Sequence, residues 1–196
     1  MSSGFTYNLN APVEKEERYS VKTGQVRIGP YKLVNENIPA GTKLPSFMPV
    51  QADLKDKFAY PVINVEVAVK YESGTKIKIK KGSFPYVGMI LGSGTKGASV
   101  TAIDKTGADF DIITLSKEFG ESVEKGAVLF EASDEAGTKQ KYVANSALYG
   151  GNNTVQDGIT LIALLRTAAE IEPSKLNVPF SRNDKENMKG WFEFNE

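Results

Sequence analysis

The sequence contains no cysteine and no histidine. Without cysteine there can be no disulfide, no thiolate zinc site and no cysteine nucleophile. Without histidine there is no Ser-His-Asp triad, no imidazole acid–base catalysis and no imidazole ligand for a transition metal. The remaining reactive groups are carboxylates, lysines and tyrosines, together with oxygen ligands for hard cations. We therefore expect a protein that is not an enzyme, with no catalytic residue, no cofactor and no metal.

Long hydrophobic runs are also missing. No apolar stretch approaches the roughly 18–20 residues needed to cross a bilayer, and the first 20 residues lack the basic-then-apolar order of a signal peptide. We expect synthesis in the cytoplasm and no membrane partner. The composition is that of an ordinary globular protein, since 40% of the 196 residues are hydrophobic and 24% are charged. A chain of this length can bury a substantial core.

Arginine is scarce, with four residues, and the net charge is zero. The charge is nevertheless uneven, with 14 Lys and Arg against 8 Asp and Glu in residues 1–98, and 10 against 16 in residues 99–196. Such asymmetry indicates either a partner surface or ordinary fluctuation along the chain. The most basic run, KIKIKK (76–81), alternates lysine with isoleucine and lacks interleaved aromatic residues, which is typical of a solvated strand face. We expect no nucleic-acid partner.

Apolar and polar residues alternate with period two through most of the chain, with Gly and Pro between the segments. YPVINVEVAVKY (60–71) and TKIKIKKGSF (75–84) flank a short polar turn, which predicts a β-hairpin over residues 60–84. Similar segments follow at short, regular spacing. The sequence predicts a mostly β fold, an antiparallel β-sandwich or barrel-like module with few short helices and extended termini.

Helix signals are few. LSKEFGE (115–121) could form one turn, and ITLIALLRTAAEI (159–171) suits either a helix or a buried strand, of which we favour the strand. In the segment 181–194, Ser181 or Asn183 could be the N-cap of a short C-terminal helix.

The chain divides into three predicted parts. Residues 1–24 form an N-terminal extended arm, since they show no durable hydrophobic period. Residues 25–172 form a β-rich body, which can hold an inserted hairpin subdomain around residues 60–115. Residues 173–196 form a C-terminal tail. No internal repeat is apparent.

Apolar residues in the two terminal parts are candidates for contact with a partner. The arm has too few of them to pack its own core, yet they alternate as on the inward face of a strand. The tail holds the only tryptophan, beside two phenylalanines, and these rings should dock either on the body or on a partner. The predicted partner-binding residues are Phe5, Tyr7, Leu9, Val13, Trp191, Phe192 and Phe194.

The segment SVTAIDKTGADFDIITL (99–115) places Asp104, Asp109 and Asp111 within eight positions. A calcium loop needs oxygen ligands at alternate positions and a bidentate closing acid, whereas here only two of the aspartates have that spacing. Asp104 to Gly107 instead has the pattern of a tight turn, with Asp first and Gly fourth. We predict turn chemistry rather than a metal site.

Two further motifs are weaker. GSGTKG (92–97) has the glycines of a phosphate loop but no Gly-Lys-Ser/Thr, so a flexible turn is favoured. Glu118, Glu121 and Glu124 could supply paired carboxylates for glycoside chemistry, but their spacing fixes no pair across a cleft, and a solvated loop is favoured.

Several segments carry a resemblance to known proteins. NIPAGTKLPSFMPVQAD (37–53) resembles the LPAGTVL segment of small viral capsid decoration proteins, and SVEKGAVLFEA (122–132) has the same polar turn, glycine and apolar strand. GITLIALLRTAAEI (158–171) resembles the strand that closes such modules. Together with the arrangement of residues 75–115, these segments are similar to head fiber and decoration proteins of tailed phages and prophages.

This resemblance implies a β-rich structural protein on the outside of an icosahedral phage capsid. It further implies a homotrimer that contacts the major capsid protein and is located in the virion after synthesis in the host cytoplasm. The N-terminal arm would become ordered on the shell.

Two other readings remain open at this point. One is a carbohydrate-binding or adhesin-like β-sandwich, and the other is a carboxylate-based hydrolase with two acids across a cleft. For the sugar binder, aromatic residues should cluster on one open face; the candidates are Tyr60, Tyr71, Tyr86, Tyr149 and Trp191.

Overall fold

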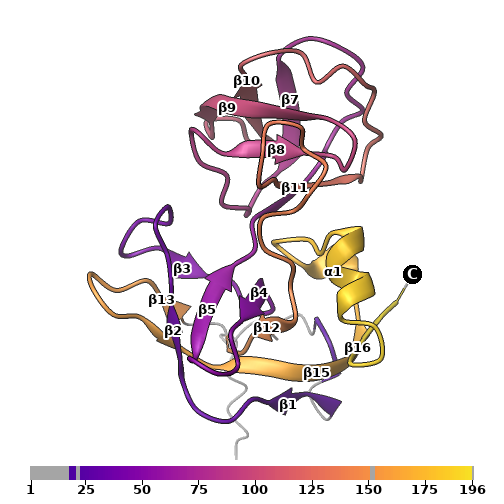
Figure 1. The fold of residues 1–196 in the computed structure, drawn as a ribbon. Helices are drawn as coiled ribbons and strands as arrows, with labels where there is room; N and C mark the ends of the chain where they lie inside the picture. Colours follow the sequence, from indigo (N-terminus) through magenta and orange to yellow (C-terminus); the bar gives the residue numbers. More distant parts are fainter. Residues whose placement is uncertain (1–17, 21–22, 151–152, 196) are drawn as a thin grey trace, which may run out of the picture.

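A computed structural model describes residues 18–20, 23–150 and 153–195 of the chain, shown as a ribbon in Figure 1. Strand accounts for 39% and helix for 6%, which confirms the prediction of a mostly β fold. None of the helices in this part of the chain is long and apolar enough to cross a bilayer.

The strands form two large sheets and one small pair. Eight belong to one sheet, six to a second sheet, and β3 and β13 pair only with each other. The strands are β1 (Gln25–Val26), β2 (Tyr31–Leu33), β3 (Lys43–Leu44), β4 (Pro49–Ala52), β5 (Phe58–Pro61), β6 (Asn64–Glu66), β7 (Lys76–Lys80), β8 (Ile90–Gly92), β9 (Gly97–Asp104), β10 (Phe110–Leu115), β11 (Val128–Glu131), β12 (Ser146–Leu148), β13 (Asn153–Thr154), β14 (Leu161–Ile162), β15 (Leu164–Ile171) and β16 (Phe192–Phe194).

The eight-stranded sheet has the order β1-β15-β12-β4-β5-β2-β14, and β16 is added alongside β15. Two pairs are parallel, β2 with β5 and β15 with β16, and the others are antiparallel. The pairs at the two ends of this order, β1 with β15 and β2 with β14, join the same two segments of the chain, since β1 precedes β2 and β14 precedes β15. The sheet therefore curves back on itself in a barrel-like way, around a core that includes Tyr31, Leu44, Met48, Leu148 and Leu164.

The six-stranded sheet is inserted between β5 and β12 and has the antiparallel order β6-β11-β8-β9-β10-β7. Its first and last strands also meet, because Val67 bridges Ile79 and the Ala68 N–H donates to the Lys78 carbonyl at 2.9 Å. This sheet also closes on itself and encloses a core of its own. In Figure 1 it forms the upper part of the molecule, and the eight-stranded sheet lies below it.

The predicted hairpin over residues 60–84 forms only in part, through the antiparallel bridge between Val67 and Ile79 and the bond from the Ala68 N–H to the Lys78 carbonyl. Residues 60–71 do not form one strand, because the chain passes from the lower sheet to the upper sheet between β5 and β6, directly after Pro61. β6 pairs with β11, and β7 pairs with β10. The inserted sheet extends from Asn64 to Glu131, further than the segment 60–115 expected from the sequence.

The helix predictions have mixed outcomes. Residues 115–121 form no helix, so that prediction is wrong; β10 ends at Leu115, and Phe119 then packs into the core. The segment 159–171 forms strands β14 and β15, as favoured. Helix α1 (Arg182–Asn187) begins after Ser181, whose side chain accepts a hydrogen bond from the Asp184 N–H in a capping box.

The C-terminal segment, expected to be an extended tail, is folded in its described residues. It contains a 3-10 helix, η2 (Pro173–Lys175), then α1, and then β16 alongside β15. At the other end, residues 18–20 also lie against β15, because Ser20 donates to the Ala169 carbonyl and Glu172 donates to the Arg18 carbonyl, both at 3.0 Å. Part of the predicted arm therefore packs on the body.

A buried carboxylate connects the two sheets. Asp184 of α1 is fully buried and accepts hydrogen bonds from Asn64 Nδ2 (2.7 Å), Gln140 Nε2 (3.0 Å), the Ala144 N–H (2.7 Å) and the Ser181 N–H (2.9 Å). Asn64 belongs to the upper sheet, while the 140–144 segment leads into the lower one. Asp184 thus fixes the point at which the chain passes between them.

The IPAGT motif forms a tight turn that occurs three times in the fold. In residues 39–42, the fourth N–H donates to the first carbonyl (3.2 Å) and Gly41 has φ 83°, a conformation that glycine adopts without strain. In each of the three turns, the glycine N–H also donates to the carbonyl of a valine from a distant segment. The N–H of that valine donates in return to the carbonyl of the residue after the glycine. The three turns and their valines are 39–42 with Val155, 86–89 with Val100, and 124–127 with Val67.

Candidate functional site

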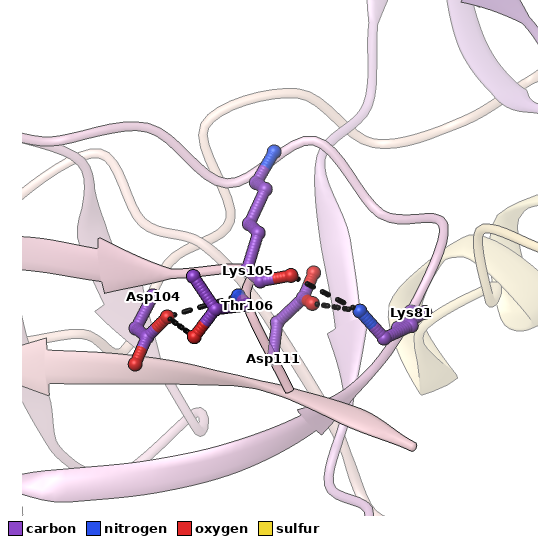
Figure 2. A network of polar contacts seen from close by, with 5 residues as sticks. All are labelled: Lys81, Asp104, Lys105, Thr106 and Asp111. Carbon is purple, nitrogen blue, oxygen red and sulfur yellow. Dashed lines mark hydrogen bonds and ion pairs between the residues drawn. The ribbon is translucent and has the colours of Figure 1, made fainter. Parts of the chain in front are cut away.

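The three clustered aspartates do not converge, and Figure 2 shows two of them, Asp104 and Asp111, with separate partners. Asp104 accepts hydrogen bonds from the Thr106 N–H (2.9 Å) and hydroxyl (2.6 Å), which is the turn predicted from the sequence. Both hydrogen bonds lower the pKa of Asp104, and the bond from the Thr106 hydroxyl has the larger effect. Asp109 is exposed, whereas Asp111 is buried on the inner face of β10. Among the described residues, no three acidic side chains are arranged to hold a metal ion.

Asp111 forms the ion pair shown in Figure 2. Its Oδ1 lies 3.0 Å from Lys81 Nζ, which also donates to the Lys105 carbonyl at 3.3 Å. Lys81 can reach it because β7 and β10 are paired, with Asp111 opposite Ile79. A buried carboxylate needs such a partner, since an unpaired charge is costly to desolvate.

The other acidic candidates are also separate from one another. Glu118 accepts from the Gly74 N–H, Glu121 accepts from Ser93 and Thr95, and Glu124 pairs with Lys70 at 3.1 Å. Each carboxylate has its own partner, and no two of them share one, so the described contacts give no catalytic pair.

The lysine run on β7 is split between two environments. Lys76 and Lys78 are exposed, and the Lys78 ammonium lies 4.7 Å from the centre of the Phe110 ring. Lys80 instead pairs with Glu66 at 3.4 Å, and Lys81 with Asp111. Only half of the run therefore presents free positive charge to solvent.

The aromatic candidates for a sugar-binding face do not share one face. Tyr71 is buried and bonded through its hydroxyl, Tyr60 stacks on Tyr142 at 5.0 Å, and Tyr86 donates to Glu131. Of the five candidates, two are exposed, Tyr149 at 43% and Trp191 at 52%. The proposed open platform of five rings is therefore not formed.

The candidate partner-binding residues fall into three groups. Phe5, Tyr7, Leu9 and Val13 lie outside the described residues. Phe192 is buried in the core beneath α1, and Phe194 packs partly against the same core. Trp191 is exposed and stacks on Arg166, with 4.7 Å between the guanidinium carbon and the ring centre. Of the C-terminal rings, Trp191 is the one whose surface is open to a partner.

A polar cluster lies where Tyr86 and Glu131 of the upper sheet meet the segment that returns to the lower sheet. Glu131 is buried, accepts a hydrogen bond from Tyr86 and pairs with Lys141 Nζ at 2.8 Å. Burial, and then the bond to Glu131, raise the pKa of the Tyr86 hydroxyl. For Lys141, burial lowers the pKa, but the contact with Glu131 outweighs it and the net pKa is raised.

A cleft of about 1070 Å³ lies between the segment 37–46, the segment 81–85 and the Lys105 turn. The Lys81–Asp111 pair forms part of its wall. Four cationic side chains line it, and Asp111 is the one carboxylate among its described lining residues. The cations are Arg18, Lys43, Lys81 and Lys105. The cleft therefore has an excess of positive charge, which suits an anionic ligand.

Sequence reasoning did not identify this cleft, because its lining residues come from distant parts of the chain. Lys43 follows the IPAGT turn, while Tyr149 and Asn177 come from after β12 and after η2. Two of the lining features could be recognised in the sequence, the IPAGT turn and Lys81. Nothing in the sequence pattern around either one indicates that the two lie close together in the fold. Only the packing of the two sheets brings them together.

Comparison with known proteins gives one match. No curated protein and no solved structure was found to match the chain. A family model described as head fiber protein matches residues 1–193, nearly the whole chain. Two of the segments that carried the resemblance, 37–53 and 122–132, contain two of the three equivalent turns. By this match the chain belongs to the phage head fiber protein family, whose members are structural proteins of the phage particle.

Proposed function

We propose that this protein binds the outside of the phage capsid as a homotrimer and contacts the major capsid protein with its lower end. The family match supports a structural role in the phage particle. The observation that supports this particular end is a group of exposed apolar side chains in or beside the strands that close the eight-stranded sheet. We call these four residues the apolar row: Val26, Ile28, Ile159 and Leu161.

The apolar row comes from both sides of one antiparallel ladder, in which β1 pairs with β15 and β2 with β14. Ile28 is 90% exposed and Ile159 is 64% exposed. Burying one such side chain contributes about 1.5–3 kcal/mol, and grouped exposed apolar residues commonly mark interaction sites. In Figure 1, β1 and β15 lie at the end of the molecule away from the six-stranded sheet, which would leave that sheet pointing outward.

The N-terminal arm is the second proposed contact. Phe5, Tyr7, Leu9 and Val13 supply apolar side chains that can add to a strand edge of a neighbour or of the shell. Ordering such a segment costs about 1–2 kcal/mol per residue, so these side chains must supply the compensating burial. Arg18, beside the end of β15, begins the described chain.

The apolar row can be tested with the double substitution Ile28→Glu and Ile159→Glu. We expect a folded protein that is monomeric in light scattering and no longer co-sediments with capsids, because the charges oppose burial of the ladder. Val87→Glu is the matched control, since Val87 is 62% exposed but lies in the turn before β8 of the upper sheet. A double variant that still forms trimers and binds capsids would show that the apolar row is not the contact surface.

A further inference from the structure

The cleft between the two sheets holds polar groups that the described protein does not use. Lys43 and Lys105 are exposed, and neither ammonium has a hydrogen bond or ion pair with a described residue. Lys81 is already neutralised by Asp111 at 3.0 Å. Arg18 donates to the Ser46 hydroxyl (2.8 Å) and carbonyl (3.2 Å), and no described carboxylate pairs with it. In the described part of the chain, three positive charges on this concave surface therefore have no carboxylate partner.

Uncharged polar groups line the same surface. The side-chain amides of Asn37 and Asn177 are exposed and have no hydrogen-bond partner among the described residues. The Ser83 hydroxyl is buried without a partner in the described chain. Such groups favour a ligand that both donates and accepts hydrogen bonds.

Three aromatic side chains line the cleft: Tyr19, Phe84 and Tyr149. Tyr19 packs on Phe47 and Phe84 packs against the core of the lower sheet, whereas Tyr149 is 43% exposed. Its face is available for an apolar surface of a ligand, while its hydroxyl can remain hydrated. A single exposed ring suits one sugar ring, whereas a nucleic-acid strand is usually held by several stacked rings.

We propose that this cleft binds an acidic saccharide. The carboxylate of the sugar pairs with Lys43 and Lys105, its hydroxyl groups bond to Asn37 and Asn177, and one ring packs on Tyr149. A volume of about 1070 Å³ is enough for a short oligosaccharide. This binding would be separate from attachment to the capsid, because the apolar row lies on the closing ladder and lines no part of the cleft.

The test uses the full-length chain and three probes in calorimetric titrations: a trimer of galacturonic acid, a neutral galactose trimer and a short oligothymidylate. We expect the acidic trimer to bind at least about tenfold more tightly than the neutral one, because charge-assisted hydrogen bonds are the stronger class. Binding should also weaken as salt is raised, since the lysines are exposed.

Substitutions assign the binding to the cleft. Lys43→Ala with Lys105→Ala should weaken the acidic trimer by about tenfold, and Tyr149→Ala should weaken both saccharides. The matched control is Lys117→Ala with Lys125→Ala, which removes two exposed lysines that do not line the cleft. Thermal melting of each variant verifies that it is folded.

Three results would overturn the proposal. The first is no binding of the acidic trimer to the unmodified protein. The second is an equal loss of binding in the control pair, which would indicate unspecific attraction by lysines. The third is tighter binding of oligothymidylate than of the acidic trimer, which would indicate a nucleic-acid site. None of these results depends on whether the protein attaches to a capsid.

Discussion

Asp184 shows how a single residue can hold the fold together. It accepts four hydrogen bonds, and three of them are buried: those from Asn64 Nδ2, the Ala144 N–H and the Ser181 N–H. We predict that Asp184→Ala lowers the free energy of unfolding by about 2–4 kcal/mol, because each unsatisfied buried donor costs about 1–3 kcal/mol. Ser181→Ala removes the helix cap and the bond from the Ser181 hydroxyl to Gln140 Oε1 (2.8 Å), and should cost about 1–2 kcal/mol. Urea unfolding measures both, and equal losses would contradict this role of Asp184.

Tyr86 should give the protein a distinctive response to high pH. Its pKa is raised in the folded state, so the folded protein keeps this proton after the unfolded chain has lost it. The stabilising contribution is therefore complete below the ordinary tyrosine pKa of about 10 and is lost as the pH rises above it. We predict that the unfolding free energy falls more steeply between about pH 10 and about pH 12 in the unmodified protein than in Tyr86→Phe. Parallel slopes would show that Tyr86 does not contribute.

The aspartates of residues 104–111 should have structural rather than metal-binding effects. Asp111→Asn removes one partner of a buried ion pair and should cost about 1–3 kcal/mol, while Asp109→Asn, at an exposed position, should change stability by less than about 0.5 kcal/mol. Calcium should not raise the melting temperature of any of these proteins. A calcium-dependent rise would show that the native state binds the ion.

At the scale of elements, one close contact between loops depends on glycine. Gly137, in the segment between β11 and β12, has φ 70°, and a Cβ there would lie 2.1 Å from the Lys96 carbonyl and 2.4 Å from Gly97 Cα. These are backbone atoms that cannot move aside cheaply. The 132–140 segment thus packs directly on the GSGTKG turn, which serves packing rather than phosphate binding.

We predict that Gly137→Ala lowers the unfolding free energy by more than about 3 kcal/mol, since both backbone strain and a steric clash act there. Gly120→Ala is a matched control, because Gly120 has φ 76° but a Cβ there would meet nothing within 4 Å. It should cost only the strain, about 1–2 kcal/mol. Differential scanning calorimetry compares the stabilities of the two variants. Equal losses of stability would mean that the 132–140 segment and the GSGTKG turn can move apart without a free-energy cost.

At the scale of the whole molecule, the charge asymmetry along the sequence disappears. Residues 1–98 and 99–196 both contribute strands to both sheets. The six-stranded unit, residues 64–131, contains 9 Lys and Arg and 9 Asp and Glu, and the remainder contains 15 of each. The opposite charges of the two halves are therefore interleaved and do not give two oppositely charged bodies. They cannot serve as an argument for association between subunits.

The boundary of the arm can be tested by two deletions. Removing residues 1–17 should leave the melting temperature nearly unchanged, since that segment has too few apolar residues to form a core. Removing residues 1–20 should lower it, because Tyr19 packs on Phe47 with ring centres 4.8 Å apart and Ser20 bonds to β15. Loss of folding on removing residues 1–17 would show that the arm is an integral part of the body.

The sequence by itself determined the features that depend on neighbours in the chain. Period-two alternation predicted a mostly β fold, because side chains of a strand point alternately to its two faces. The cap of α1 at Ser181 and the turn at Asp104 were also readable, since each involves residues two or three positions apart. The lack of cysteine and histidine excluded whole classes of chemistry without any structure.

Only the tertiary structure decided which strands pair and what lies between the sheets. Residues 60–71 look like one strand because alternation continues through Pro61, yet the chain changes sheets there. The partner of Asp111 is 30 positions away, and the three equivalent turns share little beyond one glycine. Such contacts depend on the register and packing of distant segments, and local patterns carry no information about either. The cleft is a product of that packing and so could not be read from the sequence.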